Sequence, residues 1–386
     1  MTGHPTGRIR VGVVGASLNR SWGAIAHLPA LMQLPDFQVT AVATRSAATA
    51  NEAANAFGIP FALCDAHELA CHPEVDLVVA AAGIPTHASV IRAALACGKH
   101  VLSEWPLGVS VNEAAELLNL AKAAGVVHAV GLQGLHAPGV RFVRDLLAGD
   151  RIGDIRCVRA LAAADGGRSV SYKSGGLTEP VAGASILTIT GGHVLSVLAE
   201  TVGPVASLSA SVRYESDQGT AAEANEARPI GSIDEVAVIG TLRNHAIVSL
   251  VLRRSPPGEP DFFIEIVGTR GMLRVQPGDL GPAQHSINIG RWTVMMSASD
   301  GQFKELPLPD KYRIAPYDIR PGFTHNVAAL YCELDNAIKE NRLAFPSFHT
   351  GVYFHRLIET VLAAARSGQR LAVADDLTGC SLERGL

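Results

Sequence analysis

The sequence predicts an α/β protein with a doubly wound parallel sheet at its N-terminus, followed by an α+β domain with a mostly antiparallel sheet. As far as residue 132, short apolar runs alternate with segments of helical periodicity. After residue 150, strand-like runs follow one another without long helices between them. A chain of 386 residues that is 48% hydrophobic has enough apolar material for two such domains.

Continuous apolar runs in the first part indicate parallel strands with helices on both faces. The expected strands are residues 9–15, 39–44, 75–83, 100–104 and 126–132, and the expected helices are 22–32, 47–57, 87–97 and 111–123. The chain connects them strand to helix to strand, which is the βαβ pattern of a doubly wound sheet. We therefore assign a first domain to residues 7–133.

A different rhythm marks the remainder, 134–386, which begins with a helix at 140–147. The expected strands are residues 155–164, 205–214, 234–244, 246–254, 262–269, 271–277 and 292–297. Further helices are expected at 189–200, 324–339 and 351–366, the last two packing back toward the first domain. Two glycine-rich or polar stretches, 165–183 and 217–230, are expected to be loops.

Charge and cysteine content exclude several classes of protein. Thirty-two Lys and Arg against 36 Asp and Glu leave a net charge of -4 without a basic cluster, so no direct nucleic-acid binding is expected. No apolar run suits a membrane span, and we expect a cytoplasmic protein. The six cysteines predict reduced, buried thiols rather than disulfides. His67 and His72 are five residues apart, which argues against a zinc helix, and no metal is expected.

A turn after the first strand is a candidate dinucleotide site. Gly15 is followed by Ser17, Leu18 and Asn19 in a turn longer than G-x-G-x-x-G. A glycine at the carboxyl end of a parallel strand lets a diphosphate approach backbone N–H groups and a helix N-terminus. The same glycine also fits an ordinary turn, and this pattern alone leaves both interpretations open.

The end of the second strand indicates which coenzyme is preferred. It carries Thr44, Arg45 and Ser46 instead of the acidic residue that binds a ribose 2′-hydroxyl. Arginine and serine suit a 2′-phosphate, so NADP(H) is favoured over NAD(H). Alternatively, Ser46 caps the next helix and Arg45 is a solvated side chain.

Several longer motifs resemble those of the glucose-fructose oxidoreductase, inositol dehydrogenase and rhizopine-catabolism family. The matching segments are residues 83–87 (GIPTH), 96–107 (ACGKHVLSEWPL), 146–149, 152–155, 267–271, 337–339 and 346–348. The fungal galactose-pathway corepressor branch is similar in residues 27–30 (HLPA), 104–105 (EW), 132–134 (LQG) and 192–193 (GH). The resemblance implies a Rossmann domain that binds NAD(P), an open-faced C-terminal sheet for oligomer contacts, and a ligand cleft between the domains.

The family's catalytic residues are only partly matched. Its Glu-Lys-Pro lysine corresponds to Trp105, and the aspartate four residues before the helix histidine corresponds to Ile189. His193 is the titratable residue that matches, and we expect it to transfer the proton; an interior structural histidine is the alternative. Tyr172 and Lys173 either replace the missing lysine or form a solvated loop pair.

The remaining candidate residues surround the coenzyme. Glu104 and Pro106 are expected to shape the nicotinamide pocket, and Trp105 either stacks on a ring or fills space. Pro85 and His87 begin a helix, where His87 either approaches the coenzyme or caps that helix. Candidate cleft residues are Gln133 and His136, which interdomain packing would explain equally well.

Two functions from different classes fit these observations. The first is an NADP(H)-dependent oxidoreductase that acts on a carbohydrate-like ring or a related carbonyl or imine. The second is a non-catalytic NAD(P)-binding regulator similar to the galactose corepressor. In either case we expect a homodimer or homotetramer formed through the C-terminal sheet, and for the enzyme a small-molecule substrate.

Overall fold

The computed structural model of this chain describes residues 7–19, 21–165, 184–214, 233–255, 262–278, 286–297, 301–316, 319 and 322–374. Two compact units divide it. Unit 1 comprises Met1–Gln133 and Ile314–Val352, and unit 2 comprises Gly134–Arg313 and Tyr353–Leu386. The first unit thus extends beyond the expected 7–133, because a late segment of the chain returns to it.

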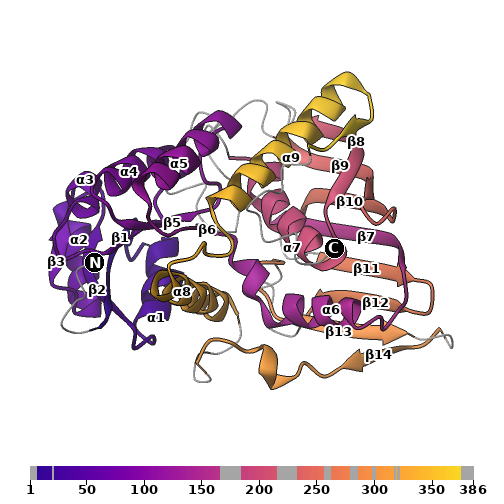
Figure 1. Cartoon of the computed structure of the whole chain (residues 1–386), viewed down its shortest axis with the longest axis horizontal. Coiled ribbons are helices and arrows are strands. Elements are labelled where there is room, and N and C mark those ends of the chain that lie inside the picture. The colour runs from indigo at the N-terminus through magenta and orange to yellow at the C-terminus, as the bar shows by residue number, and fades with distance from the viewer. Residues whose placement is uncertain are drawn as a thin grey trace, which may run out of the picture. The chain divides into compact units, whose positions relative to one another are not determined.

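Unit 1 is built on a six-stranded parallel sheet in the order β3-β2-β1-β4-β5-β6 (Figure 1). Its strands are β1 (Ile9–Val14), β2 (Phe37–Ala43), β3 (Phe61–Leu63), β4 (Leu77–Ala80), β5 (His100–Glu104) and β6 (His128–Gly131). The order reverses between β1 and β4. The doubly wound Rossmann sheet predicted from the sequence is confirmed.

Helices cover both faces of this sheet. The π-helical segment η1 (Gly23–His27), α1 (Leu28–Leu31) and α8 (Phe323–Glu340) pack on one another, and the buried core between them and the sheet includes Val11 and Val13. On β1 the intervening Gly12 faces the other way, with Leu69 of α3 (Ala66–Ala70) next to its Cα. Alternate strand residues point to opposite faces, so these are two separate layers.

The other helices of unit 1 are α2 (Ala47–Phe57), α4 (Ile84–Ala96) and α5 (Val111–Ala124). Local sequence sets where they begin, because Ser46 Oγ accepts the N–H of Thr49 and Ser110 Oγ accepts the N–H of Glu113. The short elements β3 and α3 were not expected from the sequence. They are three and five residues long, too short for a periodic pattern to form.

Unit 2 contains a nine-stranded sheet in the order β14-β13-β12-β11-β7-β10-β9-β8-β15. All neighbours are antiparallel except β7 and β10. The strands are β7 (Ile155–Asp165), β8 (Val205–Tyr214), β9 (Ile233–Leu242), β10 (Ile247–Ser255), β11 (Phe262–Gly268), β12 (Met272–Pro277), β13 (Trp292–Ser297), β14 (Phe303–Leu306) and β15 (Leu371–Ala372). This confirms the mostly antiparallel second sheet.

Within the described part of unit 2, helices cover one face of that sheet and leave the other face open. The helices of unit 2 are α6 (Pro138–Ala148), α7 (Gly192–Val202) and most of α9 (Phe348–Ser367), with the π-helical segment η4 (Leu187–Gly191) just before α7. Val238 and Leu250 point to the covered face and are buried. Ile239, Ile247 and Val251 point to the open face with exposed fractions of 59%, 54% and 40%.

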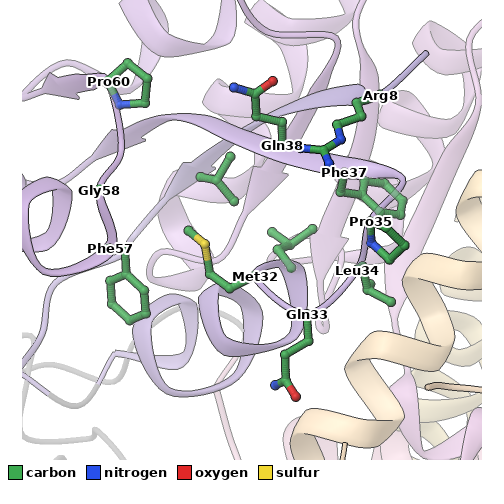
Figure 2. A pocket seen from close by; sticks show the side chains of 12 residues that line it. Arg8, Met32, Gln33, Leu34, Pro35, Phe37, Gln38, Phe57, Gly58 and Pro60 are labelled. Carbon is green, nitrogen blue, oxygen red and sulfur yellow. The ribbon is translucent and has the colours of Figure 1, made fainter. Parts of the chain in front are cut away.

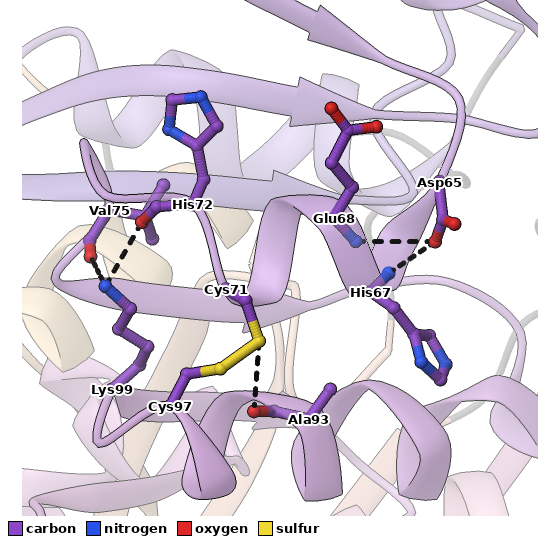
Figure 3. The surroundings of a disulfide bond; sticks show 9 residues. All are labelled: Asp65, His67, Glu68, Cys71, His72, Val75, Ala93, Cys97 and Lys99. Carbon is purple, nitrogen blue, oxygen red and sulfur yellow. Dashed lines mark hydrogen bonds between the residues drawn. A yellow bond between two sulfur atoms is a disulfide. The ribbon is translucent and has the colours of Figure 1, made fainter.

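One expectation about the cysteines is wrong. Cys71, at the end of α3, forms a disulfide with Cys97 at the end of α4, whereas reduced thiols were expected (Figure 3). Beside it, Lys99 Nζ donates to the carbonyl oxygens of His72 at 3.1 Å and Val75 at 2.7 Å. Cys64 is a free thiol and is exposed, not buried. The pairing joins residues 26 positions apart that only the packing of α3 on α4 brings together.

No helix in the described ranges combines the length and the apolar character that a membrane crossing requires.

Candidate functional site: a dinucleotide site at the carboxyl edge of the parallel sheet

The loop after β1 has the tight glycine turn that a dinucleotide site needs. Gly15 adopts φ 91° and its N–H donates to Ala43 O at 2.9 Å, which bends the chain across the end of β2. A Cβ at Gly15 would lie 2.6 Å from Ala81 O, so a side chain does not fit between the loop and β4. Glycine is therefore required where the strand order reverses, the usual position of a bound dinucleotide.

A second glycine completes this turn, and the sequence pattern did not reveal it. In the spacing G-x-G-x-x-G counted from Gly15, the two later glycine positions hold Ser17 and Arg20, and Arg20 lies outside the described residues. In the structure, Gly23 takes that role, because a Cβ there would lie 2.5 Å from Gly15 O. Ser21 Oγ donates to Ser17 O at 2.6 Å and closes the longer loop between them. The helix thus packs on the turn as closely as in G-x-G-x-x-G, but the glycine that allows this packing lies later in the sequence.

The end of β2 carries a cluster of hydroxyl groups. Thr44 Oγ1 and Ser46 Oγ lie 2.6 Å and 2.9 Å from Thr49 Oγ1, at the N-terminus of α2. Ser46 is the N-cap of that helix, as the alternative interpretation expected, and Arg45 is exposed beside it. Three hydroxyls, a helix N-terminus and a guanidinium in one place form a suitable environment for an anion.

Past β5, the chain makes the turn Glu104-Trp105-Pro106, with a cis peptide before the proline. His87 is buried and holds this turn from α4. Its Nδ1 lies 2.9 Å from Pro106 O and its Nε2 lies 3.0 Å from Ala82 O. Burial lowers the pKa of His87, which favours the neutral ring that donates to one of the two carbonyls. His87 therefore neither caps α4 nor offers a free ring nitrogen; it links the ends of β4 and β5.

Glu104 is held from the other side by two residues that the sequence did not single out for this role. His27 Nε2 lies 3.0 Å from Glu104 Oε1, and His27 Nδ1 lies 2.7 Å from the hydroxyl of Tyr331 on α8. A Cβ on Gly131 would overlap the Glu104 carboxylate, since its Oε2 is only 2.8 Å from that position. His27 was noted only as part of a motif, because 77 and 304 residues separate it from its partners.

Gln133 follows β6 and is buried, with an exposed fraction of 1%. Its Oε1 has no hydrogen-bond partner within the described residues. A buried amide oxygen without a donor is costly and commonly marks the place of a ligand or water. This orphaned acceptor at the same edge of the sheet suits a donor such as a carboxamide N–H.

In unit 2, His193 lies in the first turn of α7, directly after η4. It is 7% exposed, and burial lowers its pKa to about 4. Its Nδ1 has no hydrogen-bond partner among the described residues. The preceding Gly191 does not open space for a ligand, because a Cβ there would lie 2.9 Å from Leu252 Cδ1.

The remaining predicted residues lie in different surroundings. Leu18 packs against the hydrophobic core of unit 1, which indicates a structural role, whereas Asn19 and Pro85 are exposed near the turn and the start of α4. Trp105 and His136 are both buried. Tyr172 and Lys173 lie outside the described residues.

Taken together, the residues of unit 1 fit a dinucleotide. Gly15 makes the tight turn where the strand order reverses, which is the usual position of a diphosphate, the end of β2 offers hydroxyls and a cation, and Gln133 presents an amide oxygen without a partner among the described residues. A separate pocket of about 400 Å³ lies at the opposite edge, where Met32, Phe57 and Pro60 line it near the start of β2 (Figure 2). It is remote from the carboxyl ends where such sites are built.

Comparisons with known proteins agree with this architecture. Residues 9–132 match the model of an oxidoreductase family with an NAD-binding Rossmann fold, and residues 138–277 match the Gal80p C-terminal domain. The first domain of the chain belongs to the Gfo/Idh/MocA oxidoreductase family. The second domain is similar to that of Gal80.

Relatives of both functional types are similar over nearly the whole chain. An uncharacterized oxidoreductase of Synechocystis is 24% identical over 362 residues, 93% of this chain and 96% of its own. The galactose/lactose regulatory protein Gal80 of Saccharomyces cerevisiae is 25% identical over 432 residues, 95% of each chain. A crystal structure of its super-repressor mutant has a TM-score of 0.80 at 22% identity, covering 96% and 99% of the two chains.

Levoglucosan dehydrogenase in complex with NADH and levoglucosan gives a TM-score of 0.79. Its identity is 19%, with coverage of 95% of this chain and 100% of that one. At such identities these crystal structures establish the shared fold.

Proposed function

We propose that this Gfo/Idh/MocA protein is an NADP(H)-dependent oxidoreductase that transfers hydride to or from a carbohydrate-like substrate or a related carbonyl or imine. The observation that carries the proposal is the glycine turn of Gly15 and Gly23, together with the hydroxyl cluster at the end of β2. The sugar-bound dehydrogenase among the structural neighbours supports the substrate class.

The preference for NADP(H) rests on the end of β2. A 2′-phosphate carries negative charge and several acceptor oxygens, which Arg45 and the hydroxyls of Thr44 and Ser46 can bind. The N-terminus of α2 adds a favourable partial charge. No carboxylate follows β2 to repel that phosphate, since residues 44–46 are Thr, Arg and Ser.

When bound, the coenzyme supplies or accepts the hydride. His193 takes the proton in this proposal. A ring with a pKa of about 4 is neutral at pH 7, and Nδ1, without a protein partner among the described residues, is free to accept a proton from a substrate hydroxyl during oxidation. In the reverse direction, the protonated ring would be a strong acid that donates to the carbonyl oxygen.

Coenzyme choice is tested by calorimetry with NADP(H) and NAD(H). Arg45→Asp should weaken NADP(H) binding at least tenfold and leave NAD(H) binding equal or stronger, because the new carboxylate repels the 2′-phosphate. Arg8→Asp is the matched control. It makes the same charge change in unit 1, but at the amino ends of the strands, because Arg8 directly precedes β1. Equal losses for both coenzymes, or none, would contradict the assignment of the 2′-phosphate site.

Proton transfer is tested by turnover of sugars and ketones, followed at the nicotinamide absorbance. His193→Gln should lower kcat about 10²–10⁴-fold while coenzyme affinity stays the same. His355→Gln is the matched control, because it replaces another buried histidine of unit 2 whose pKa burial lowers to about 4. Turnover that is identical in wild type and His193→Gln would remove His193 from the mechanism.

A regulator that binds NAD(P) without catalysis is the second candidate. Trp105 is buried where the family's enzymes have lysine, and a base with a pKa of about 4 is far from the value near 7 that suits general base catalysis. The relation to Gal80, named as a regulatory protein, favours this candidate too. A protein that binds NADP(H) but turns over none of the substrates would decide for it.

A further inference from the structure

Three side chains from three separate elements form a buried chain of hydrogen bonds in unit 1. Glu104 ends β5, His27 ends η1 and Tyr331 lies in the middle of α8. The chain runs from Tyr331 Oη to His27 Nδ1 at 2.7 Å, and from His27 Nε2 to Glu104 Oε1 at 3.0 Å. His27 and Tyr331 are each fully buried, and Glu104 keeps an exposed side-chain fraction of 12%.

The chemistry of these groups fixes the proton positions. A carboxylate only accepts hydrogen bonds, so His27 Nε2 must carry the hydrogen that it donates to Glu104. In the tautomer whose one hydrogen is on Nε2, the lone pair is on Nδ1, and the Tyr331 hydroxyl donates to it. Burial, and secondarily the charge of Glu104, raise the pKa of Tyr331 well above its ordinary value, which keeps that hydroxyl protonated.

At its Tyr331 end, this chain of hydrogen bonds stops inside the protein and does not reach solvent. Tyr331 packs edge-on against Phe37 with ring centroids 5.4 Å apart, within the hydrophobic core of unit 1. A proton relay needs an exchangeable group at each end, and a fully buried phenol provides none. The arrangement therefore holds Glu104 in place and does not conduct protons to it.

The position of Glu104 indicates what this placement is for. In a doubly wound sheet, one half of a dinucleotide lies over each side of the point where the strand order reverses. The hydroxyl cluster that suits the adenosine phosphate follows β2, so the nicotinamide half belongs over β4, β5 and β6. Glu104 lies at the carboxyl end of β5, on this nicotinamide side.

We propose that His27 and Tyr331 are positioning residues that fix the Glu104 carboxylate at the nicotinamide half of the site, and that this charge favours the oxidised coenzyme over the reduced one. The inference rests on the proposed function. The oxidised nicotinamide ring is a cation and the reduced ring is neutral. A negative charge held nearby, largely out of solvent, therefore binds the oxidised form preferentially.

Local packing supports a fixed carboxylate. Gly131, the partner of Glu104 on β6, lacks the Cβ that would collide with the carboxylate. His87 holds the next part of the turn through Pro106 O at 2.9 Å. The π-helical η1, a rare geometry that often accompanies functional sites, ends at His27 and sets its ring between the other two groups.

The test compares Kd values for NADP⁺ and NADPH by calorimetry in wild type, Glu104→Gln, His27→Leu and Tyr331→Phe. Glu104→Gln should reduce the preference for NADP⁺ over NADPH at least about threefold, because it removes the charge with little change in shape. His27→Leu should shift the ratio in the same direction. Tyr312→Phe is the matched control, because it removes a buried tyrosine hydroxyl that donates to Asp145 Oδ2 at 3.0 Å in unit 2.

A second measurement does not depend on coenzyme. Nitrogen NMR of the histidine rings in the free protein should show His27 with its hydrogen on Nε2, and Tyr331→Phe should change that signal while Tyr312→Phe does not. Unchanged Kd ratios in Glu104→Gln and His27→Leu, with only thermal stability lost, would overturn this inference and leave the proposed function standing. Failure of wild type to bind either coenzyme would overturn both, whatever the NMR result.

Discussion

Single residues in this protein are constrained more by their neighbours in space than by their place in a motif. Gly23 shows this, because the turn needs a glycine there only after the chain has looped through Ser21 to return to Gly15. A pattern with fixed spacing cannot locate such a residue. Gly15 and Ser46 could be found from the sequence because strand ends and helix caps have local signatures, and Glu104 could be found from the family resemblance, whereas Tyr331 could not.

Buried histidines give this protein a predictable response to acid. His128 on β6 accepts the N–H of Phe348 through Nδ1 at 3.2 Å, which requires a deprotonated nitrogen. Burial, followed by the nearby His349, lowers its pKa to about 4 from the ordinary 6.5. Between these values the unfolded chain binds a proton that the folded protein does not, so stability falls as the pH decreases.

The free energy of unfolding, measured with urea, should therefore be about 2 kcal/mol lower at pH 5 than at pH 7 from His128 alone. His128→Asn keeps an acceptor for the N–H of Phe348 but does not titrate. Between pH 7 and pH 5, its free energy of unfolding should therefore fall by about 2 kcal/mol less than that of wild type. The same pH dependence in wild type and His128→Asn would show that this side chain does not account for the effect.

At the scale of elements, the sequence predicts long periodic segments well and irregular ones poorly. Helices α2 and α5 lie within a residue of their expected ranges, since Ser46 and Ser110 begin them and glycines follow them. The apolar pattern of η1 and η4 is the same as that of an α-helix. Each segment is only five residues long, which is too short for the sequence pattern to distinguish a π-helix from an α-helix. The buried His27 is the last residue of η1, and the buried His193 lies two residues after the end of η4.

The disulfide between α3 and α4 should stabilise unit 1. A cross-link that closes 26 residues lowers the entropy of the unfolded chain by an amount worth about 3 kcal/mol. Cys97→Ser, or reductant added to wild type, should lower the melting temperature by several degrees. Cys64→Ser removes a free, exposed thiol from the same unit and should melt like wild type. A melting temperature insensitive to both treatments would contradict this prediction.

For the whole molecule, the open face of the second sheet is the surface that best suits contact with another protein chain. Its exposed Ile239, Ile247 and Val251 lie on the paired strands β9 and β10. Exposed apolar clusters of this kind typically mark protein interfaces. We propose that two copies of the chain associate through this face.

Ile239→Asp should accordingly convert the oligomer to monomers, measured by sedimentation at micromolar concentration, because it places a charge in an apolar contact. Leu120→Asp is the control, since it changes another exposed leucine-sized side chain, 39% exposed, on α5 of unit 1. If wild type is itself monomeric, or if both variants retain the wild-type mass, the proposed interface is wrong.

The return of residues 314–352 to unit 1 has a consequence for how the protein is made. During synthesis the six-stranded sheet leaves the ribosome long before α8 does, and until then Val11, Val13 and the ring of His27 lack the cover that this helix provides. A nascent chain halted before Ile314 therefore lacks the part of the core of unit 1 that α8 contributes. The Rossmann unit matures only when nearly the entire polypeptide has been translated.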